Sequence, residues 1–178
     1  MPSMGRFAAI AVLLLCVSSL FAQKEKREPL TEAEIEQIRE AGIDPVERVL
    51  LYTKFLDQHA EAIKSLSNRA KSAARSNRLD DELQDFTALM DELGSNLDVF
   101  SERKADIRKP LEPLAEAAQR WVRILRALAG EPGFDLARKE AIESGEELAD
   151  EASRLFREQT NYFNEHKEEK GQDRAEPK

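Results

Sequence analysis

Shortages of cysteine, histidine and aromatic residues limit the chemistry of this chain of 178 residues. It contains one cysteine, two histidines and 6% aromatic residues. The cysteine, Cys16, lies in an N-terminal segment that we expect to be removed, so the remaining chain would have no thiol and no disulfide. Thiol catalysis and cysteine-ligated zinc are then excluded, and packing alone must stabilise the fold.

Basic residues are also in deficit. The formal net charge is -8, and it becomes -9 without residues 1–22 because Arg6 is their only charged residue. Such an acidic chain is a poor non-specific binder of nucleic acid, so we predict no nucleic-acid partner. Charged residues nevertheless make up 35% of the chain, with few glycines and prolines, which suits long solvated helices.

The N-terminus has the pattern of a signal peptide. Arg6 precedes an apolar run from Phe7 to Val17, and Ala22 is a plausible cleavage point. The apolar stretch of residues 7–22 is shorter than the ~20 residues that span a bilayer. Two alternatives remain, an uncleaved anchor and a lipoprotein modified at Cys16, although lipoproteins carry a small residue where this chain has Leu15. We therefore expect a periplasmic or secreted protein without a transmembrane helix in its mature form.

Apolar residues recur at alternating steps of three and four over most of the remaining chain. A mean step of 3.5 places them on one stripe of each helix, as in coiled coils. The sequence therefore predicts an all-α fold, an antiparallel up-and-down bundle of four long helices with a short N-terminal helix. The expected segments are a signal peptide at 1–22, a flexible leader at 23–30, the bundle domain at 31–167 and a disordered tail at 168–178.

Capping residues set the expected helix boundaries. Thr31 and Glu34 form a capping box for the short helix, which should stop near Ala41 with Gly42 just past its end. Asp44 and Pro45 open the next helix. The four long helices are expected at 44–76, 79–108, 111–129 and 135–166, with a tight turn at 76–78.

Two prolines leave the third and fourth long helices open to a second interpretation. The apolar stripe keeps its register across Pro110 and Pro113, which would suit one kinked helix over 79–129. A proline inside a helix costs about 3 kcal/mol, however, and a helix that begins at Pro110 would have both prolines in its first turn. We therefore favour a break at Arg108-Lys109.

No residue pattern indicates a catalytic centre, a metal site or a cofactor site. His59 lies on a core stripe without a second ligand one turn away, and His166 lies near a helix end. The glutamate and histidine spacing of di-iron bundles is absent, as are phosphate-binding and nucleophile motifs. We predict no cofactor, and His59 is expected to fill space in the core.

Two groups of residues are candidates for interaction. Leu50, Leu51 and Phe55 exceed what a narrow stripe requires, so they either cover the short N-terminal helix or form an exposed patch for a partner or a second copy. The second group is basic and lies between residues 64 and 78 without an acid, and it contains Lys64, Arg69, Lys71 and Arg75. These cations either match the dipole at a helix C-terminus or form a docking patch for an anionic envelope surface.

A short N-terminal segment carries a family resemblance. Leu30-Thr31-Glu32-Ala33-Glu34, with Gln37-Ile38-Arg39-Glu40 after it, resembles the Leu-Thr-x-x-Gln motif of small periplasmic helical stress chaperones. That resemblance implies an all-helical, ATP-independent protein that holds unfolded chains on an apolar concave face. The signal peptide, Asp44-Pro45-x-x-Arg48 and the heptads are also similar to uncharacterised secreted bacterial helical-bundle proteins.

These observations favour a non-catalytic secreted or periplasmic bundle with a structural or protein-interaction role. The partner is an unknown protein or a second copy of the chain, with an anionic envelope surface as a further partner. An ATP-independent periplasmic holdase is the alternative. An enzyme is the third hypothesis, and it would need a closed polar pocket that the sequence does not indicate.

Overall fold

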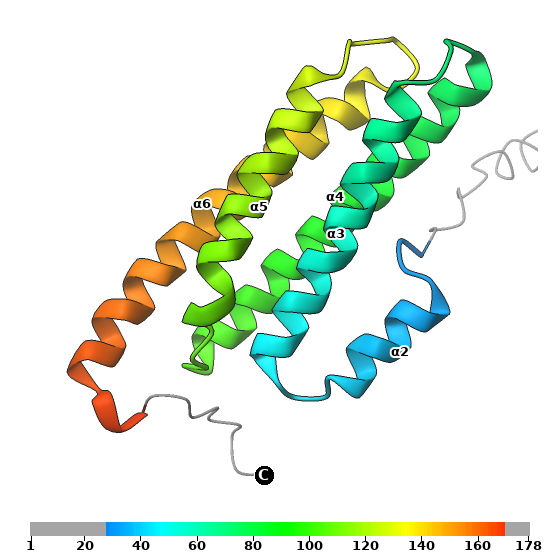
Figure 1. Cartoon of the computed structure of the whole chain (residues 1–178). Coiled ribbons are helices and arrows are strands. Elements are labelled where there is room, and N and C mark those ends of the chain that lie inside the picture. Colours follow the sequence, from blue (N-terminus) through cyan, green and yellow to red (C-terminus); the bar gives the residue numbers. More distant parts are fainter. Residues whose placement is uncertain (1–27, 170–178) are drawn as a thin grey trace, which may run out of the picture.

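The computed structural model describes residues 28–169 (Figure 1). All helices in this range are, in order, α2 (Glu32–Glu40), α3 (Pro45–Ser67), α4 (Ala73–Glu102), α5 (Arg108–Ala127), α6 (Asp135–Glu165) and the 3-10 helix η1 (Lys167–Glu169). No strand occurs among the described residues, so the predicted all-α bundle of four long helices and one short helix is confirmed.

Several predictions about the chain ends lie outside this range. They include the signal peptide at 1–22, most of the leader at 23–30 and residues 170–178 of the predicted tail. In the part of the chain that the structure describes, no helix has the length and apolar content needed to cross a membrane.

The short helix α2 has the predicted ends. The Thr31 side chain accepts a hydrogen bond from the Glu34 backbone N–H, and the Glu34 carboxylate accepts one from the Thr31 backbone N–H at 2.8 Å. Gly42 follows the helix at a φ of 58°, a left-handed conformation that glycine adopts without strain. Leu30 and Ile38 are buried in the core cluster, so α2 is fastened to α3 by apolar contact.

Helix α3 ends earlier than the sequence suggests. The predicted end at residue 76 is wrong, because α3 stops at Ser67 and α4 begins at Ala73. The turn therefore lies at 68–72 rather than at 76–78. Ser72 is the N-cap of α4, with its side chain accepting from the Arg75 backbone N–H at 3.2 Å. A serine N-cap was the available signal, but the uninterrupted apolar stripe masked it.

A break between α4 and α5 is confirmed, so residues 79–129 are not one kinked helix, but its predicted place at Arg108-Lys109 is wrong, because α4 ends at Glu102 and Arg108 is already the first residue of α5. Helix α4 ends in a Schellman motif, in which the Ala105 N–H donates to the Phe100 carbonyl and the Lys104 N–H to the Ser101 carbonyl. Lys104 occupies the left-handed position with a φ of 56°. Lysine has no special preference for this conformation, so sequence alone gives no signal for the end of α4.

The start of α5 differs slightly from the prediction. The helix begins at Arg108, so Pro110 lies in the first turn, where no intrahelical hydrogen bond is lost. Pro113 lies inside the helix, contrary to the expectation that both prolines belong to the first turn. Helix α6 begins at Asp135 and ends at Glu165, close to the predicted 135–166.

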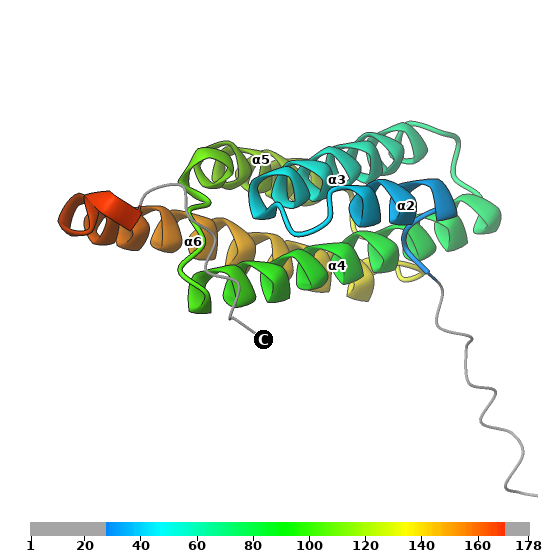
Figure 2. The ribbon, with the colours of Figure 1, turned by 90° about the horizontal axis from the view of Figure 1, so that it is seen from below.

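Paired contacts along the helices give the arrangement of the bundle. Hydrogen bonds join Arg48 to Asn96, Tyr52 to Glu92 and His59 to Glu82, so the pairs run in opposite order along α3 and α4. Helices α5 and α6 form a second hairpin of this kind, and the two hairpins pack side by side. Figure 2 shows α3 and α5 in one layer and α4 and α6 in the other.

This packing places consecutive helices α4 and α5 diagonally across the bundle. They make no helix–helix contact with each other, because α3 and α6 lie between them. The connector between them is held by Gln159 of α6, which accepts from the Ile107 N–H at 3.0 Å and donates to the Ala105 carbonyl at 2.9 Å. Gln159 is buried, and its amide satisfies both groups of the crossing segment.

The core runs the whole length of the bundle. Its largest fully buried side chains include Trp121, Tyr52, Phe55 and Phe86, and the ring planes of Phe86 and Trp121 meet edge to face with centroids 5.7 Å apart. Gly145 of α6 lets α5 approach closely, because a Cβ there would lie 2.9 Å from Val122 Cγ2. The side chains of the predicted apolar stripes are therefore buried mainly against one another within the chain.

Candidate interaction surface

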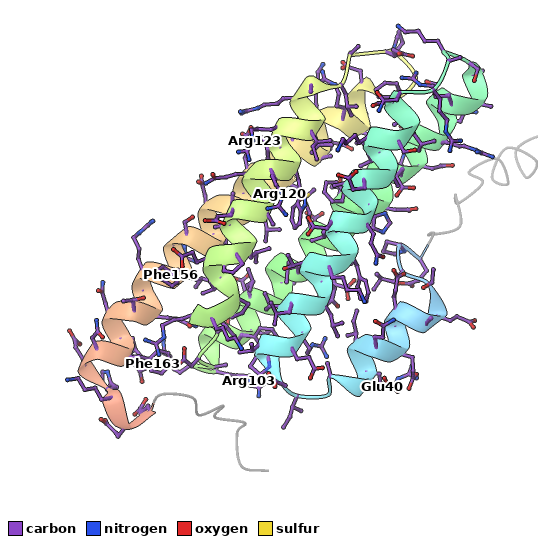
Figure 3. The ribbon with its side chains drawn as sticks, viewed as in Figure 1. Glu40, Arg103, Arg120, Arg123, Phe156 and Phe163 are labelled. Atoms are coloured by element: carbon purple, nitrogen blue, oxygen red, sulfur yellow. The ribbon has the colours of Figure 1, made fainter. Side chains whose placement is uncertain are left out.

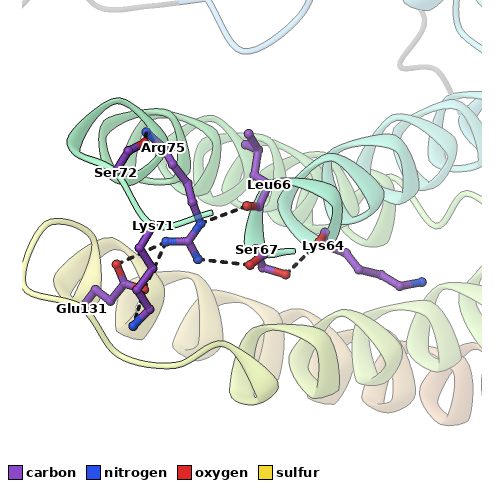
Figure 4. Close-up of polar contacts among 7 residues, drawn as sticks. All are labelled: Lys64, Leu66, Ser67, Lys71, Ser72, Arg75 and Glu131. Atoms are coloured by element: carbon purple, nitrogen blue, oxygen red, sulfur yellow. Dashed lines mark hydrogen bonds and ion pairs between the residues drawn. The ribbon is translucent and has the colours of Figure 1, made fainter. Parts of the chain in front are cut away.

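A buried arginine organises the end of the bundle where α3, α4 and the α5–α6 loop meet (Figure 4). Arg75 donates from Nε to the Leu66 carbonyl at 3.1 Å and from Nη2 to the Ser67 carbonyl at 3.2 Å. Its Nη1 lies 3.1 and 3.2 Å from the two carboxylate oxygens of Glu131. Arg75 therefore caps the C-terminus of α3 and ties the first hairpin to the loop of the second.

Glu131 is the anionic partner of this cluster. Lys71 Nζ lies 3.4 Å from Glu131 Oε1. Burial opposes ionisation of Glu131, but hydrogen bonds from Arg75 and Lys71 outweigh it and lower the pKa of the carboxyl. The carboxylate therefore stays charged under mildly acidic conditions, which keeps the buried Arg75 guanidinium neutralised.

The structure changes the interpretation of the basic segment. The sequence reasoning placed the whole segment at the end of one helix, where cations match the dipole, but Arg75 and Arg78 lie in the first turns of α4. Positive charge is unfavourable at a helix N-terminus. Arg75 is stabilised there by Glu131 and two carbonyl groups, so dipole matching at α3 explains only Lys64 of the predicted residues.

The other predicted basic residues lie around the same turn. Lys64 is in the last turn of α3 and pairs with Glu61 at 3.2 Å, with both side chains more than half exposed. Arg69 is exposed in the 68–72 turn and lines a groove of about 410 Å³ between α3 and α4. Arg78, Asp81 and Glu82 line this groove too, so its charge is mixed. The structure therefore brings Lys71 and Arg75 together on Glu131 and leaves Lys64 and Arg69 apart.

The predicted apolar residues divide between core and surface. Phe55 is fully buried, and Leu51 is half-buried against the core cluster to which Leu30 and Ile38 also belong. Leu50 is 43% exposed and is the member of the group that faces solvent. Phe55 and Leu51 therefore fit the interpretation that they cover the N-terminal helix, and Leu50 alone is available to a partner.

His59 forms a hydrogen-bonded pair with a carboxylate on the neighbouring helix. Its Nδ1 lies 2.7 Å from Glu82 Oε1, and its ring packs near Phe86. Burial works against the charged ring, but the hydrogen bond to Glu82 and the nearby carboxylates of Glu82, Asp85 and Glu34 raise the pKa of His59. The pair joins α3 to α4. Within residues 28–169 no group of three or more His, Cys, Asp or Glu residues is placed to hold a metal ion.

A second groove, which the sequence does not reveal, lies between the C-terminal parts of α3 and α5 and has a volume of about 470 Å³. It is lined by Lys64, Ser67, Asn68, Arg120, Arg123, Ile124, Ala127 and Leu128. Figure 3 shows Arg120 and Arg123 along α5, on the side of the bundle formed by α3 and α5. The two arginines belong to a helix whose heptad predicts only its core face, and no local signal in the sequence indicates that α3 and α5 are adjacent.

One acidic residue fixes the geometry beside this groove. Asp57 Oδ1 of α3 accepts from Trp121 Nε1 at 2.7 Å and from Arg120 Nη2 at 3.0 Å. These bonds satisfy the indole of a buried tryptophan and set the separation of α3 and α5.

No protein-family model, curated protein or solved structure matches this chain. The resemblance to periplasmic stress chaperones and to secreted helical-bundle proteins therefore stays a prediction.

Proposed function

We propose that the chain is a non-catalytic helical-bundle protein of the periplasm or the secreted fraction, with a structural or protein-interaction role. One observation carries this proposal: the polar side chains that could do chemistry are engaged in joining helices. Arg75 is held by Glu131, His59 by Glu82, Tyr52 by Glu92 and Gln159 by the 105–107 connector.

The shape of the surface supports a binding role over a catalytic one. The two grooves are open to solvent and are not closed cavities. General acid–base catalysis needs a positioned group in a partly desolvated site. The most exposed large apolar side chains among the described residues are Ile43, Leu50, Val99 and Leu136, and they offer contacts for a protein partner.

The holdase alternative receives less support from the geometry. A holdase needs a continuous apolar surface for unfolded chains, whereas the long apolar stripes of this bundle are buried against one another. The four most exposed large apolar residues among the described residues are on four different elements, the α2–α3 loop, α3, α4 and α6. Such dispersed residues present no concave apolar face.

The test combines localisation with contact mapping in the native cell envelope. Mass analysis of the protein purified from the periplasmic fraction should show cleavage after Ala22. A photo-crosslinking amino acid at Leu50 should give a discrete adduct of reproducible mass, and one at Glu116 of α5 serves as an exposed control. Retention of the full N-terminus in the cytoplasm, or equal and diffuse crosslinking from both positions, would contradict the proposal.

A separate assay distinguishes the holdase. The purified mature protein is mixed at a one-to-one ratio with an aggregating client in the absence of ATP, and light scattering is followed. We expect no suppression of aggregation, because the apolar stripes are not accessible. Strong suppression at this ratio would replace the interaction role by the holdase role.

A further inference from the structure

The groove between α3 and α5 has an unusual balance of charge for an acidic protein. Its three charged lining residues, Lys64, Arg120 and Arg123, are all cations. Lys64 pairs with Glu61 and Arg120 with Asp57, but neither acid lines the groove. Arg123 is exposed and makes no ion pair or hydrogen bond with the other described residues. The charged lining of the groove is therefore entirely cationic, and Arg123 is the member of this set without an acidic partner among the described residues, on a chain of net charge -8.

The dipole of α3 accounts for Lys64 but not for Arg120 and Arg123, which lie on α5. The C-terminal end of α3 borders the groove and would attract cations through its free carbonyl groups. Arg75 already donates to the carbonyls of Leu66 and Ser67 from the opposite side of the turn, as Figure 4 shows. Ser67 Oγ further donates to the Lys64 carbonyl at 2.7 Å. These contacts satisfy the end of α3 without hydrogen bonds from the groove cations, which leaves the unpaired Arg123 available to a ligand together with the exposed faces of Lys64 and Arg120.

The rest of the lining is apolar or neutral. Ile124, Ala127 and Leu128 of the α5 end form an apolar side, and Leu128 belongs to the core cluster. Asn68 adds an amide that makes no hydrogen bond with the other described residues. Cations beside an apolar strip suit a ligand with an anionic head and a hydrocarbon part, and the volume of about 470 Å³ is within the ordinary range for small-molecule sites.

The neighbouring groove between α3 and α4 is a useful comparison. It has a similar volume of about 410 Å³ and also contains two arginines, Arg69 and Arg78. Asp81 and Glu82 line it as well, so an anion would meet like charge there. The two grooves thus share their size and their arginine content. The α3–α5 groove differs in having no acidic residue in its lining.

We propose that the α3–α5 groove binds an anionic phospholipid, with Arg123, Arg120 and Lys64 contacting the phosphate and Ile124, Ala127 and Leu128 contacting the first part of the acyl chains. Arginine suits this role because its planar donors match phosphate oxygens in a bidentate manner. The site goes beyond the protein-interaction role and does not depend on it, since binding would be measured with the purified protein alone.

The experiment titrates the mature protein with three probes: water-soluble dihexanoyl phosphatidylglycerol, dihexanoyl phosphatidylcholine and inorganic phosphate. Amide chemical shifts report where each probe binds. We expect phosphatidylglycerol to perturb residues 64–68 and 120–128 and to bind at least tenfold more tightly than the other two probes. Equal affinity for inorganic phosphate would mean that the apolar side contributes nothing, and it would overturn the phospholipid assignment. Equal affinity for phosphatidylcholine would overturn the role of net anionic charge.

A matched pair of double variants tests the residues. Lys64→Gln with Arg123→Gln should weaken phosphatidylglycerol binding at least tenfold. The control is Lys139→Gln with Arg157→Gln, which removes the same charge from α6, where Lys139 is likewise exposed and paired and Arg157 is exposed. The control should bind within twofold of the parent. An equal loss in both variants would show a general charge effect and refute the site, and circular dichroism confirms that each variant is folded.

Discussion

Two glycines in helix interiors separate the intrinsic cost of glycine from its role in packing. Gly94 of α4 and Gly145 of α6 lie inside long helices, where replacement by alanine should stabilise the folded state by about 0.5–1 kcal/mol. A Cβ on Gly94 would have no neighbour within 4 Å, so Gly94→Ala should give this full gain. The two variants therefore share one chemical change and differ in the space around it.

At Gly145 the same methyl group meets the next helix. It would lie 2.9 Å from Val122 Cγ2, which is closer than carbon atoms pack, and Val122 has one preferred rotamer in a helix. Overpacking of this kind costs about 1–3 kcal/mol. After the gain in helix propensity, Gly145→Ala should change stability by about 0 to 2.5 kcal/mol in the unfavourable direction. The difference between the two variants should be about 1–3 kcal/mol.

The assay is urea unfolding at constant pH, followed by circular dichroism and by the fluorescence of Trp121, the only tryptophan. Val122→Ala provides a rescue, because it removes Cγ2 and should lower the cost of alanine at position 145 when the two substitutions are combined. If Gly145→Ala proves as stable as Gly94→Ala, the close approach of α5 and α6 at this position is wrong.

Three further predictions concern polar groups. Arg75→Met leaves Glu131 and two α3 carbonyls without their partner and should destabilise the fold by about 3 kcal/mol, whereas Arg69→Met, an exposed change in the neighbouring turn, should cost less than about 0.5 kcal/mol in the same urea assay. The pKa of His59 is raised in the folded state, so its stabilising contribution should be complete below about pH 6.5 and disappear as the pH rises through the raised value. The difference in unfolding free energy between the parent and His59→Gln, measured from pH 5 to 9, should therefore shrink with rising pH. A constant difference would contradict the role of the charged pair. Gln159→Met keeps the side-chain volume but leaves the Ile107 N–H and the Ala105 carbonyl unsatisfied, so it should lower the free energy of unfolding by about 2–4 kcal/mol and speed hydrogen exchange at the Ile107 amide. Unchanged exchange there would show that Gln159 does not hold the connector.

The elements that could be predicted from the sequence are those with local signals. The capping box at Thr31, the left-handed Gly42 and the Asp44-Pro45 start of α3 depend on residues within one turn of each other, and the structure has all three. The preference for a break near Pro110 also rested on local energetics, namely the cost of a proline inside a helix.

The features that were missed depend on contacts between distant segments. The turn at 68–72 is fixed by Arg75, whose partner Glu131 is 56 residues away, and no heptad pattern reveals that pairing. The diagonal placement of α4 and α5 follows from which faces of the two hairpins pack, and Gln159 holds a connector 52 residues earlier in the chain. The α3–α5 groove was invisible for the same reason, because its two sides become neighbours only when the hairpins meet.

The crossing connector makes the two ends of the bundle mechanically unequal. At the end where residues 103–107 cross, a covalent bridge joins the hairpins, whereas at the opposite end each hairpin closes on itself and the tie between them includes the ion pair of Arg75 and Glu131. Separation of the two hairpins would therefore begin at that second end, while the connector keeps them joined at the first end. Strong acid protonates Glu131 and would weaken the ion pair at the second end. The hydrogen bonds of the uncharged Gln159 would still hold the connector at the first end.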